Sequence, residues 1–200
     1  MDLFTGTSGS ANHQLASPQG LSLDASSNTL YVADYSNSRI MQILPNSSFG
    51  NVVAGGNGAG MTNTQLYYPI RLHFDSSSNS IFIVNYGTNN IVRWVLGAIS
   101  WTLVAGSPTG ASGATPTSLF LPTDVTLDSM GNVYVADKYN HRIQFFLSGQ
   151  LNGTTIAGAT SMPGSAANQL SSPESVVVDS QFNIYVSDMN NQRIQQFLHY

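Results

Sequence analysis

Residues 133–143 read VYVADKYNHRI, and three variants of this stretch occur elsewhere in the chain. They are LYVADYSNSRI at 30–40, IFIVNYGTNNI at 81–91 and IYVSDMNNQRI at 184–194. A proline precedes each copy, and these prolines follow one another at intervals of 51, 53 and 51 residues: Pro18, Pro69, Pro122 and Pro173. A fixed period of this length indicates a repeat protein whose units fold alike.

Each unit contains four short apolar runs separated by Ser, Asn and Gly. The first run follows the proline and the second is the stretch quoted above. The third begins at its closing Ile, and the fourth ends at Gly55, Gly106 or Gly158, with residues 3–6 fitting the same slot. Runs rich in β-branched and aromatic residues between such turns predict strands. Four short strands in each unit of about 51 residues are typical of a β-propeller blade.

The units resemble NHL repeats over essentially the whole chain. The third unit shows this best, in Asp128, Gly131-Asn132, and residues 134–137 and 140–143. The resemblance implies a β-propeller, and it leaves the function open because members of this family do different things. NHL propellers resemble six-bladed wheels, whereas this chain has material for four blades.

The two ends of the chain complement each other in strand type. Residues 3–6 are a fourth-type run, and the chain ends just after the third-type run at 194–198. We predict one domain over residues 1–200, in which the N-terminal strand completes the last blade and closes a monomeric ring. The alternative is a four-repeat fragment of a six-bladed propeller, whose open edges would associate. The predicted repeat units are 15–55, 66–106, 119–158 and 170–198 plus 3–6.

The composition excludes several classes of function. Only 8% of residues are charged, against about 25% in a typical soluble domain. Six basic residues and a net charge of −4 argue against a nucleic-acid partner. The absence of cysteine excludes disulfides and thiolate sites. No apolar run is long enough to span a membrane, and no signal peptide is visible. Sequons at Asn46 and Asn152 lie in corresponding loops and favour an extracellular over a cytoplasmic location. The sequence does not decide whether these two asparagines are glycosylated.

Some recurring charged residues are expected to be structural. The second unit lacks both the aspartate and the arginine that the quoted stretch carries elsewhere, which predicts that these two residues pair. An arginine can hold a carboxylate with two hydrogen bonds and so fix a loop. The predicted pairs are Asp34 with Arg39, Asp137 with Arg142, and Asp188 with Arg193.

Residues near the propeller axis form one set of site candidates. In the first run Leu21 and Leu23 alternate with Gly20 and Ser22, so we expect the leucines to pack and the other face to line a polar channel. The charged or titratable residues at the corresponding positions of the other units are Arg71, His73 and Asp124, and Glu174 lies beside them at the entry of its strand. The resemblance implies a metal-assisted lyase or lactonase-like hydrolase as one alternative, with His73, Asp124 and Glu174 as metal ligands. The other interpretation is that Arg71 and Asp124 neutralise each other as a charge pair. A zinc site usually needs three protein ligands, and only one histidine points inward. We therefore expect no metal, cofactor or catalytic residue.

A second set of candidates lies in the loops between the second and third strands: Tyr35, Tyr86, Tyr139 and His141. These loops share one face with the long connections at 7–17, 56–68, 107–121 and 159–172. Long loops on a rigid frame are where binding residues concentrate. We therefore predict a non-enzymatic interaction module that presents loop and channel-mouth residues to a protein or carbohydrate ligand. A substrate receptor of the ubiquitin-ligase type is a further alternative.

Overall fold

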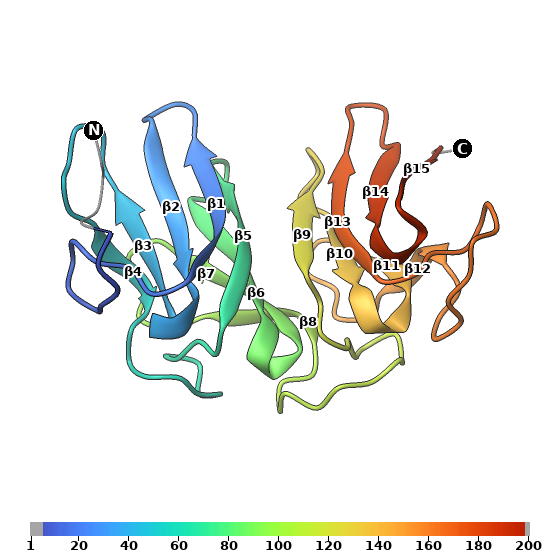
Figure 1. Cartoon of the computed structure of the whole chain (residues 1–200), viewed down its shortest axis with the longest axis horizontal. Helices are drawn as coiled ribbons and strands as arrows, with labels where there is room; N and C mark the ends of the chain where they lie inside the picture. The colour runs from blue at the N-terminus through green and yellow to red at the C-terminus, as the bar shows by residue number, and fades with distance from the viewer. Residues whose placement is uncertain (1–5, 199–200) are drawn as a thin grey trace. The chain divides into compact units, whose positions relative to one another are not determined.

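The computed structural model describes residues 6–198, which form β-strands joined by turns and by single-turn 3-10 helices (Figure 1). The chain divides into two compact units. Unit 1 comprises residues 1–87 and 92–102, and unit 2 comprises residues 88–91 and 103–200. Among the described residues, no helix has the length and apolarity required to cross a membrane.

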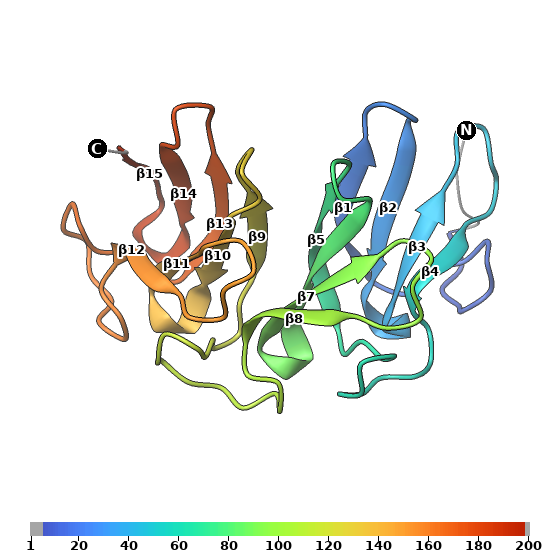
Figure 2. The ribbon, with the colours of Figure 1, turned by 180° about the vertical axis from the view of Figure 1, so that it is seen from behind.

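The first two repeats form two four-stranded sheets. The first has the order β1-β2-β3-β4 and the second β5-β6-β7-β8, with β8 beside β7 at the outer edge (Figure 2). Each sheet is one predicted blade. The strands are β1 (Pro18–Asp24), β2 (Thr29–Asp34), β3 (Arg39–Ile43), β4 (Asn51–Gly55), β5 (Pro69–Asp75), β6 (Ser80–Asn85), β7 (Asn90–Val95) and β8 (Thr102–Gly106).

The last two repeats form a four-stranded and a three-stranded sheet, with orders β9-β10-β11-β12 and β13-β14-β15. The all-β, blade-by-blade architecture is thus confirmed. The predicted strand at residues 3–6 falls mostly on residues 1–5, which lie outside the described residues, so closure of the ring stays a prediction. The strands are β9 (Asp124–Leu127), β10 (Val133–Asp137), β11 (Arg142–Phe146), β12 (Thr154–Gly158), β13 (Pro173–Val178), β14 (Ile184–Asp188) and β15 (Arg193–Phe197).

Each loop between the second and third strands of a blade contains a 3-10 turn that the sequence patterns do not predict. In every blade the residue after this turn has a left-handed backbone conformation, for example His141 with φ of 56° after the third turn. Because connections in an antiparallel sheet alternate between its two ends, these turns share one end of the blade with the long interblade loops. We call it the η end. The turns are η1 (Tyr35–Asn37), η2 (Tyr86–Thr88), η3 (Lys138–Asn140) and η4 (Met189–Asn191).

The core of each unit lies between its sheets. All six residues of β6 are buried, as expected for a strand sandwiched between neighbouring layers. In unit 1, Leu66 and Trp94 pack with residues of β2 and β6, and Leu170 packs with β10 and β14 in unit 2. Leu66, Leu119 and Leu170 occupy the same position, three residues before the repeat proline, and are fully buried. They anchor the long loops to the blades.

The predicted orientation of the first strand is wrong in the first blade. Leu21 and Leu23 are 62% and 57% exposed. Gly20 and Ser22 instead face β5, because Ser22 Oγ accepts a hydrogen bond from the Phe74 amide at 3.0 Å. A Cβ on Gly20 would lie 2.7 Å from the Ile70 carbonyl oxygen. Successive side chains on a strand point to opposite faces of the sheet, so the small residues of β1 make room for the next blade rather than lining an open channel.

Candidate functional site

A buried hydrogen-bonded clamp holds the η end of the third blade. Arg142 Nε donates to Asp137 Oδ2 at 2.8 Å, and both side chains are almost fully buried. Asp137 Oδ1 accepts the Phe120 amide at 2.7 Å, which ties the carboxylate to the end of the long loop. The two Nη groups donate to loop carbonyls of Ala114, Thr115 and Ser118. The clamp therefore fixes the whole loop from 113 to 121 on the blade.

The first and fourth blades carry the same clamp. Arg39 pairs with Asp34 at 2.7 Å, and Arg193 pairs with Asp188 at 2.8 Å. Their Nη groups again donate to carbonyls of the preceding long loop, at Ser10, Ala11 and Gln14 and at Ser165, Ala166 and Gln169. Each predicted Asp–Arg pair is present in the structure. Its role follows from these contacts, since each ion pair bonds to main-chain groups spread over seven residues of loop, at 10–16, 114–120 and 165–171.

The second blade holds its long loop with different residues. Asn85 stands where the others have aspartate, and its Oδ1 accepts the Tyr67 amide at 2.6 Å. Asn90 stands where the other blades have the clamp arginine. Instead the Trp101 indole Nε1 donates to the Gln65 carbonyl at 2.8 Å, and the Trp101 amide donates to the Asn63 carbonyl at 2.9 Å. Gln65 occupies the position of Gln14 and Gln169, so Trp101 replaces the missing guanidinium at the same carbonyl.

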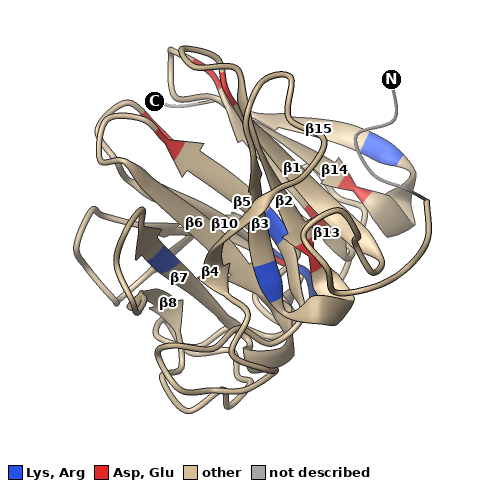
Figure 3. Ribbon diagram, turned by 90° about the vertical axis from the view of Figure 1, so that its left-hand side faces the viewer, with Lys and Arg blue, Asp and Glu red and all other residues tan. Residues whose placement is uncertain are grey.

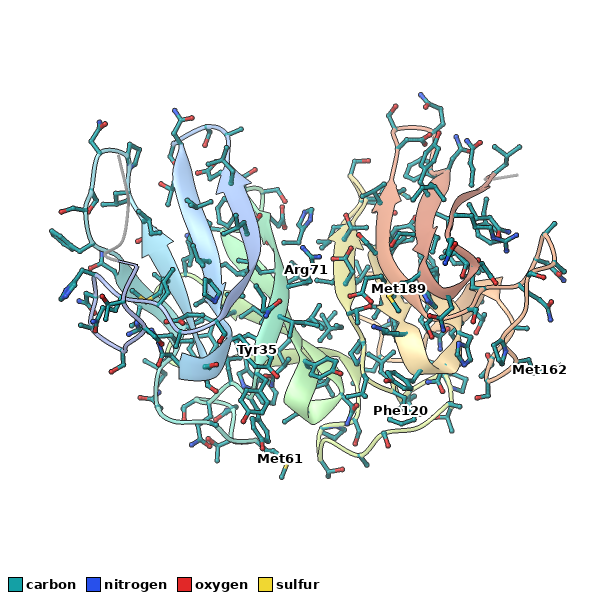
Figure 4. The ribbon with its side chains drawn as sticks, in the orientation of Figure 1. Tyr35, Met61, Arg71, Phe120, Met162 and Met189 are labelled. Carbon is teal, nitrogen blue, oxygen red and sulfur yellow. The ribbon has the colours of Figure 1, made fainter. Side chains whose placement is uncertain are left out.

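Three tyrosines form a stack at the η end of unit 1, and we call Tyr35, Tyr67 and Tyr68 the tyrosine ledge. The rings of Tyr35 and Tyr68 are parallel with centroids 4.7 Å apart, and those of Tyr67 and Tyr68 are tilted at 4.6 Å. Tyr68 is 36% exposed. The exposed Met61 lies at the same end of the unit as Tyr35 (Figure 4). The ledge is thus an aromatic surface held by ring stacking, at the end of the unit that also carries Met61.

Sequence reasoning predicts Tyr35 and misses Tyr67 and Tyr68. The missed signal is the Tyr-Tyr pair directly before Pro69, in a slot where the other units have small residues or Phe-Leu. Gly87 explains how Tyr67 fits, since a Cβ there would lie 2.8 Å from the ring Cγ of Tyr67. Tyr86, also predicted, begins η2 and is partly buried.

Unit 2 presents a smaller aromatic pair at its η end. Phe120 and Tyr139 have ring centroids 5.3 Å apart, and both rings are exposed to solvent. Tyr139 is a predicted site residue. Its neighbour His141 is predicted as a binding residue as well, but its Nδ1 accepts the Ser172 amide at 3.0 Å. In this structure His141 therefore fastens one blade to the loop before the next.

Acidification is expected to weaken this contact. Burial lowers the pKa of His141 from its ordinary value of 6.5, although Asp188 opposes the shift. The neutral imidazole is therefore favoured in the folded state, and its stabilising effect is complete above pH 6.5 and lost as the pH falls below it. We expect the unfolding free energy of the wild type to fall relative to that of His141→Asn on acidification, measured by urea unfolding. A pH-independent difference would contradict this.

The candidates near the axis fall in different units. Arg71 is exposed on β5 of unit 1, and His73 on the same strand is partly buried. Burial lowers the pKa of His73, against the opposing charge of Asp75, so this imidazole is neutral at physiological pH. Asp124 and Glu174 belong to unit 2. The predicted Arg71–Asp124 pair would join the two units and stays a prediction.

Within unit 2 the two carboxylates are bound by their neighbours. Asp124 Oδ2 accepts hydrogen bonds from the Ser175 hydroxyl and, at 3.1 Å, from the Val176 amide. Glu174 pairs with Lys138 at 2.7 Å. Both interactions link the third blade to the first strand of the fourth. Within residues 6–198, no three His, Asp or Glu side chains gather closely enough to hold a metal ion.

The surface around these residues is sparsely charged. Figure 3 shows isolated acidic and basic positions on a ribbon that is mostly neutral. The ion pairs between described residues include those of the three clamps and the Lys138–Glu174 pair. The η end therefore offers aromatic rings, amides and hydroxyls to a ligand rather than a strong electrostatic field.

Comparison with protein families identifies the repeat. Residues 15–42, 121–146 and 170–197 match the NHL repeat. The second repeat is outside these matches, which agrees with its Asn85 and Asn90 in place of the aspartate and the arginine. The sequence has no match among curated proteins.

Solved structures show the fold. An auxiliary nutrient binding protein from Bacteroides thetaiotaomicron has 18% identity and a TM-score of 0.68 over 88% of this chain and 46% of its own. A gluconolactonase from Xanthomonas campestris has 15% identity and a TM-score of 0.68 over 94% and 60%. A chain of a nidogen/laminin complex has 18% identity and a TM-score of 0.68 over 92% and 60%. The present chain therefore spans about half to three fifths of these neighbours.

Proposed function

Since this chain is an NHL-repeat β-propeller, we propose that it is a non-enzymatic binding module. It presents η-end residues to a protein or carbohydrate ligand. The observation that carries the proposal is the tyrosine ledge, in which Tyr35 and Tyr68 stack at 4.7 Å at the exposed end of unit 1.

The ledge has the physical properties of a contact surface. Tyrosine supplies a large amphipathic area with few rotatable bonds, so little side-chain entropy is lost when it binds. The Asn85–Tyr67 hydrogen bond and the Trp101–Gln65 hydrogen bond hold the loop that carries the ledge. A surface that is ordered before binding loses less entropy on association. The aromatic pair Phe120–Tyr139 offers a second contact of the same kind in unit 2.

The charge distribution favours a neutral ligand. With 8% charged residues, recognition has to rest on ring contacts and on hydrogen bonds from Asn, Ser and Thr side chains. Two structural neighbours support a binding function, one described as a nutrient binding protein and the other found in a nidogen/laminin complex. Both are neighbours in fold, so the ligand itself is part of the proposal.

The proposal includes an extracellular location. Asn46 and Asn152 are both exposed, and they lie in the β3–β4 and β11–β12 loops. These loops are at the end of the blade opposite the η end. A glycan on Asn46 would leave the tyrosine ledge of the same unit accessible.

Substitution of the ledge tests the proposal. Laminin and a panel of soluble neutral polysaccharides serve as probes, with binding measured by biolayer interferometry or affinity electrophoresis. For the probe that binds, Tyr68→Ala is expected to weaken the affinity about tenfold or more, as loss of a central aromatic contact does. The matched control is Phe49→Ala, which removes an exposed ring from the β3–β4 loop at the opposite end.

The competing enzyme hypothesis makes a different prediction. A metal-assisted hydrolase would cleave a lactone such as gluconolactone in the presence of divalent cations, and His73→Ala would abolish this activity. Turnover of that kind, together with binding that is unaffected by Tyr68→Ala, would contradict the binding-module proposal.

A further inference from the structure

Two Asn-Gly dipeptides occur in the chain, at residues 57–58 and 152–153. Asparagine loses its side-chain amide most readily before glycine, because no Cβ hinders the approach of the next main-chain nitrogen to the amide carbon. In a folded protein the reaction also depends on whether that nitrogen is free to move. The two dipeptides differ in this respect, so the structure distinguishes between them.

The main-chain nitrogen of Gly58 is accessible for reaction. Asn57 and Gly58 are both exposed, in the long loop between β4 and β5. Within residues 6–198, no acceptor binds the Gly58 N–H. A Cβ on Gly58 would have no neighbour nearer than Gln65 Nε2, at 3.9 Å. The first dipeptide therefore has the space in which its side chain and the next nitrogen can close a ring.

The main-chain nitrogen of Gly153 is held in place. Its N–H donates to the Pro116 carbonyl at 2.9 Å, and Gly153 is buried. A Cβ on Gly153 would lie 2.7 Å from the Phe146 ring. Attack on Asn152 therefore requires that this hydrogen bond break and that the packed turn open, although the Asn152 side chain itself is exposed.

The side chain of Asn57 helps to hold the loop that leads into the tyrosine ledge. Its Nδ2 donates to the Thr64 carbonyl at 2.9 Å, and Gln65 Nε2 donates to the Asn57 carbonyl at 3.1 Å. Together with the Trp101–Gln65 hydrogen bond, these contacts tie the loop in the blade that lacks the clamp arginine. Both Asn57 contacts are accessible to solvent, so water can take the place of Thr64 while the side chain reacts.

We infer that Asn57 is a site of spontaneous deamidation that loosens the loop leading into the tyrosine ledge. The Gly58 nitrogen attacks Cγ of Asn57 and loses its proton. The Cγ–Nδ2 bond then breaks, ammonia departs and a cyclic imide remains. Water opens the imide at either of its carbonyls, which gives aspartate or isoaspartate at position 57. Water is the only reactant besides the protein.

Neither product can form the Asn57–Thr64 hydrogen bond. An ionised carboxylate has no N–H to donate, and its negative charge repels the Thr64 carbonyl oxygen. Isoaspartate in addition inserts a carbon atom into the main chain directly before Gly58, whose φ is 81°. Both products therefore leave the loop at 57–66 less ordered than the asparagine does.

Ageing of the full-length protein tests the site. The protein is produced in bacteria, so that Asn152 carries no glycan, and is incubated at mildly alkaline pH. Peptide mapping by mass spectrometry follows the conversion of amide to acid at both asparagines. Conversion at Asn57 should be about tenfold faster than at Asn152, because the Gly153 N–H must first give up a hydrogen bond. In protein unfolded by guanidinium chloride, the two rates should be equal.

Three results would each overturn the assignment of the site. The first is equal rates at Asn57 and Asn152 in the folded protein, and the second is faster conversion at Asn152. The third is a folded protein in which Asn57 stays intact over the time in which both asparagines react in the unfolded chain.

The effect on the loop is tested with Asn57→Asp, which reproduces one product directly. Amide hydrogen exchange in the loop at 57–66 should become about fivefold faster, through loss of one hydrogen bond. The matched control is Asn63→Asp, which adds the same charge to the same loop at an exposed side chain that takes no part in the Asn57–Thr64 contact. Unchanged exchange in Asn57→Asp, or equal acceleration in both variants, would overturn the effect on the loop. Neither measurement uses a ligand, so both stand or fall separately from the proposed function.

Discussion

Arg142→Ala is expected to lower the unfolding free energy by about 3–5 kcal/mol, because removal of one partner leaves a buried charge uncompensated. Asp137 is fully buried, and burial raises the pKa of its carboxyl group against the opposing effects of the Phe120, Asn140 and Arg142 hydrogen bonds. The substitution also leaves three loop carbonyls without their donor. Urea unfolding followed by circular dichroism measures the loss.

Arg193→Ala is the matched control for this prediction. It removes the corresponding ion pair and loop hydrogen bonds of the fourth blade, where the Arg193 side chain is 30% exposed. Water can replace part of the ion pair and hydrogen bonds that Arg193 loses. The substitution should therefore lower the unfolding free energy clearly less than Arg142→Ala does. Equal losses would show that burial does not determine the strength of the clamp.

Trp101→Ala is expected to lower the unfolding free energy by about 3 kcal/mol, through lost packing against the unit 1 core and a lost hydrogen bond to the Gln65 carbonyl. Trp101→Phe retains an aromatic ring and removes the indole N–H, so it should cost about 1 kcal/mol. Its distinctive effect should be faster amide hydrogen exchange in the loop at 57–66, measured by mass spectrometry.

Trp94→Phe is the control for the loop effect. Its indole donates to the Ala98 carbonyl at 3.0 Å, four residues away in its own hairpin. Loss of that bond should leave exchange in the 57–66 loop unchanged. If Trp94→Phe and Trp101→Phe accelerate exchange in that loop equally, Trp101 does not stand in for the clamp arginine.

The repeat made most of the fold predictable from the sequence. Local strand patterns recur four times, so weak signals reinforce one another, and the coupled absence of the aspartate and the arginine in the second unit identified the clamp pairs. Trp101 was missed because it lies outside the repeated stretch and substitutes for arginine through a different chemical group. The faces of β1 were misassigned because alternation shows that two faces differ but does not show which neighbour each one meets.

The candidate site was less predictable. Tyr35 was found because loop aromatics stand out in an Asn- and Ser-rich chain, whereas Tyr67 and Tyr68 come from the loop that precedes the next blade. Their stacking on Tyr35 depends on how successive blades pack within unit 1. His141 looked like a binding residue in the sequence, and only the contact with the Ser172 amide shows its structural role.

The most direct test of the binding-module account is an NMR titration of tyrosine-ring-labelled protein with the probe that binds. The account predicts shifts in the ring signals of Tyr35 and Tyr68, while Tyr185, on β14 away from the η end, keeps its position. Shifts at Tyr185 with unchanged ledge signals would contradict the account and place the site away from the η end.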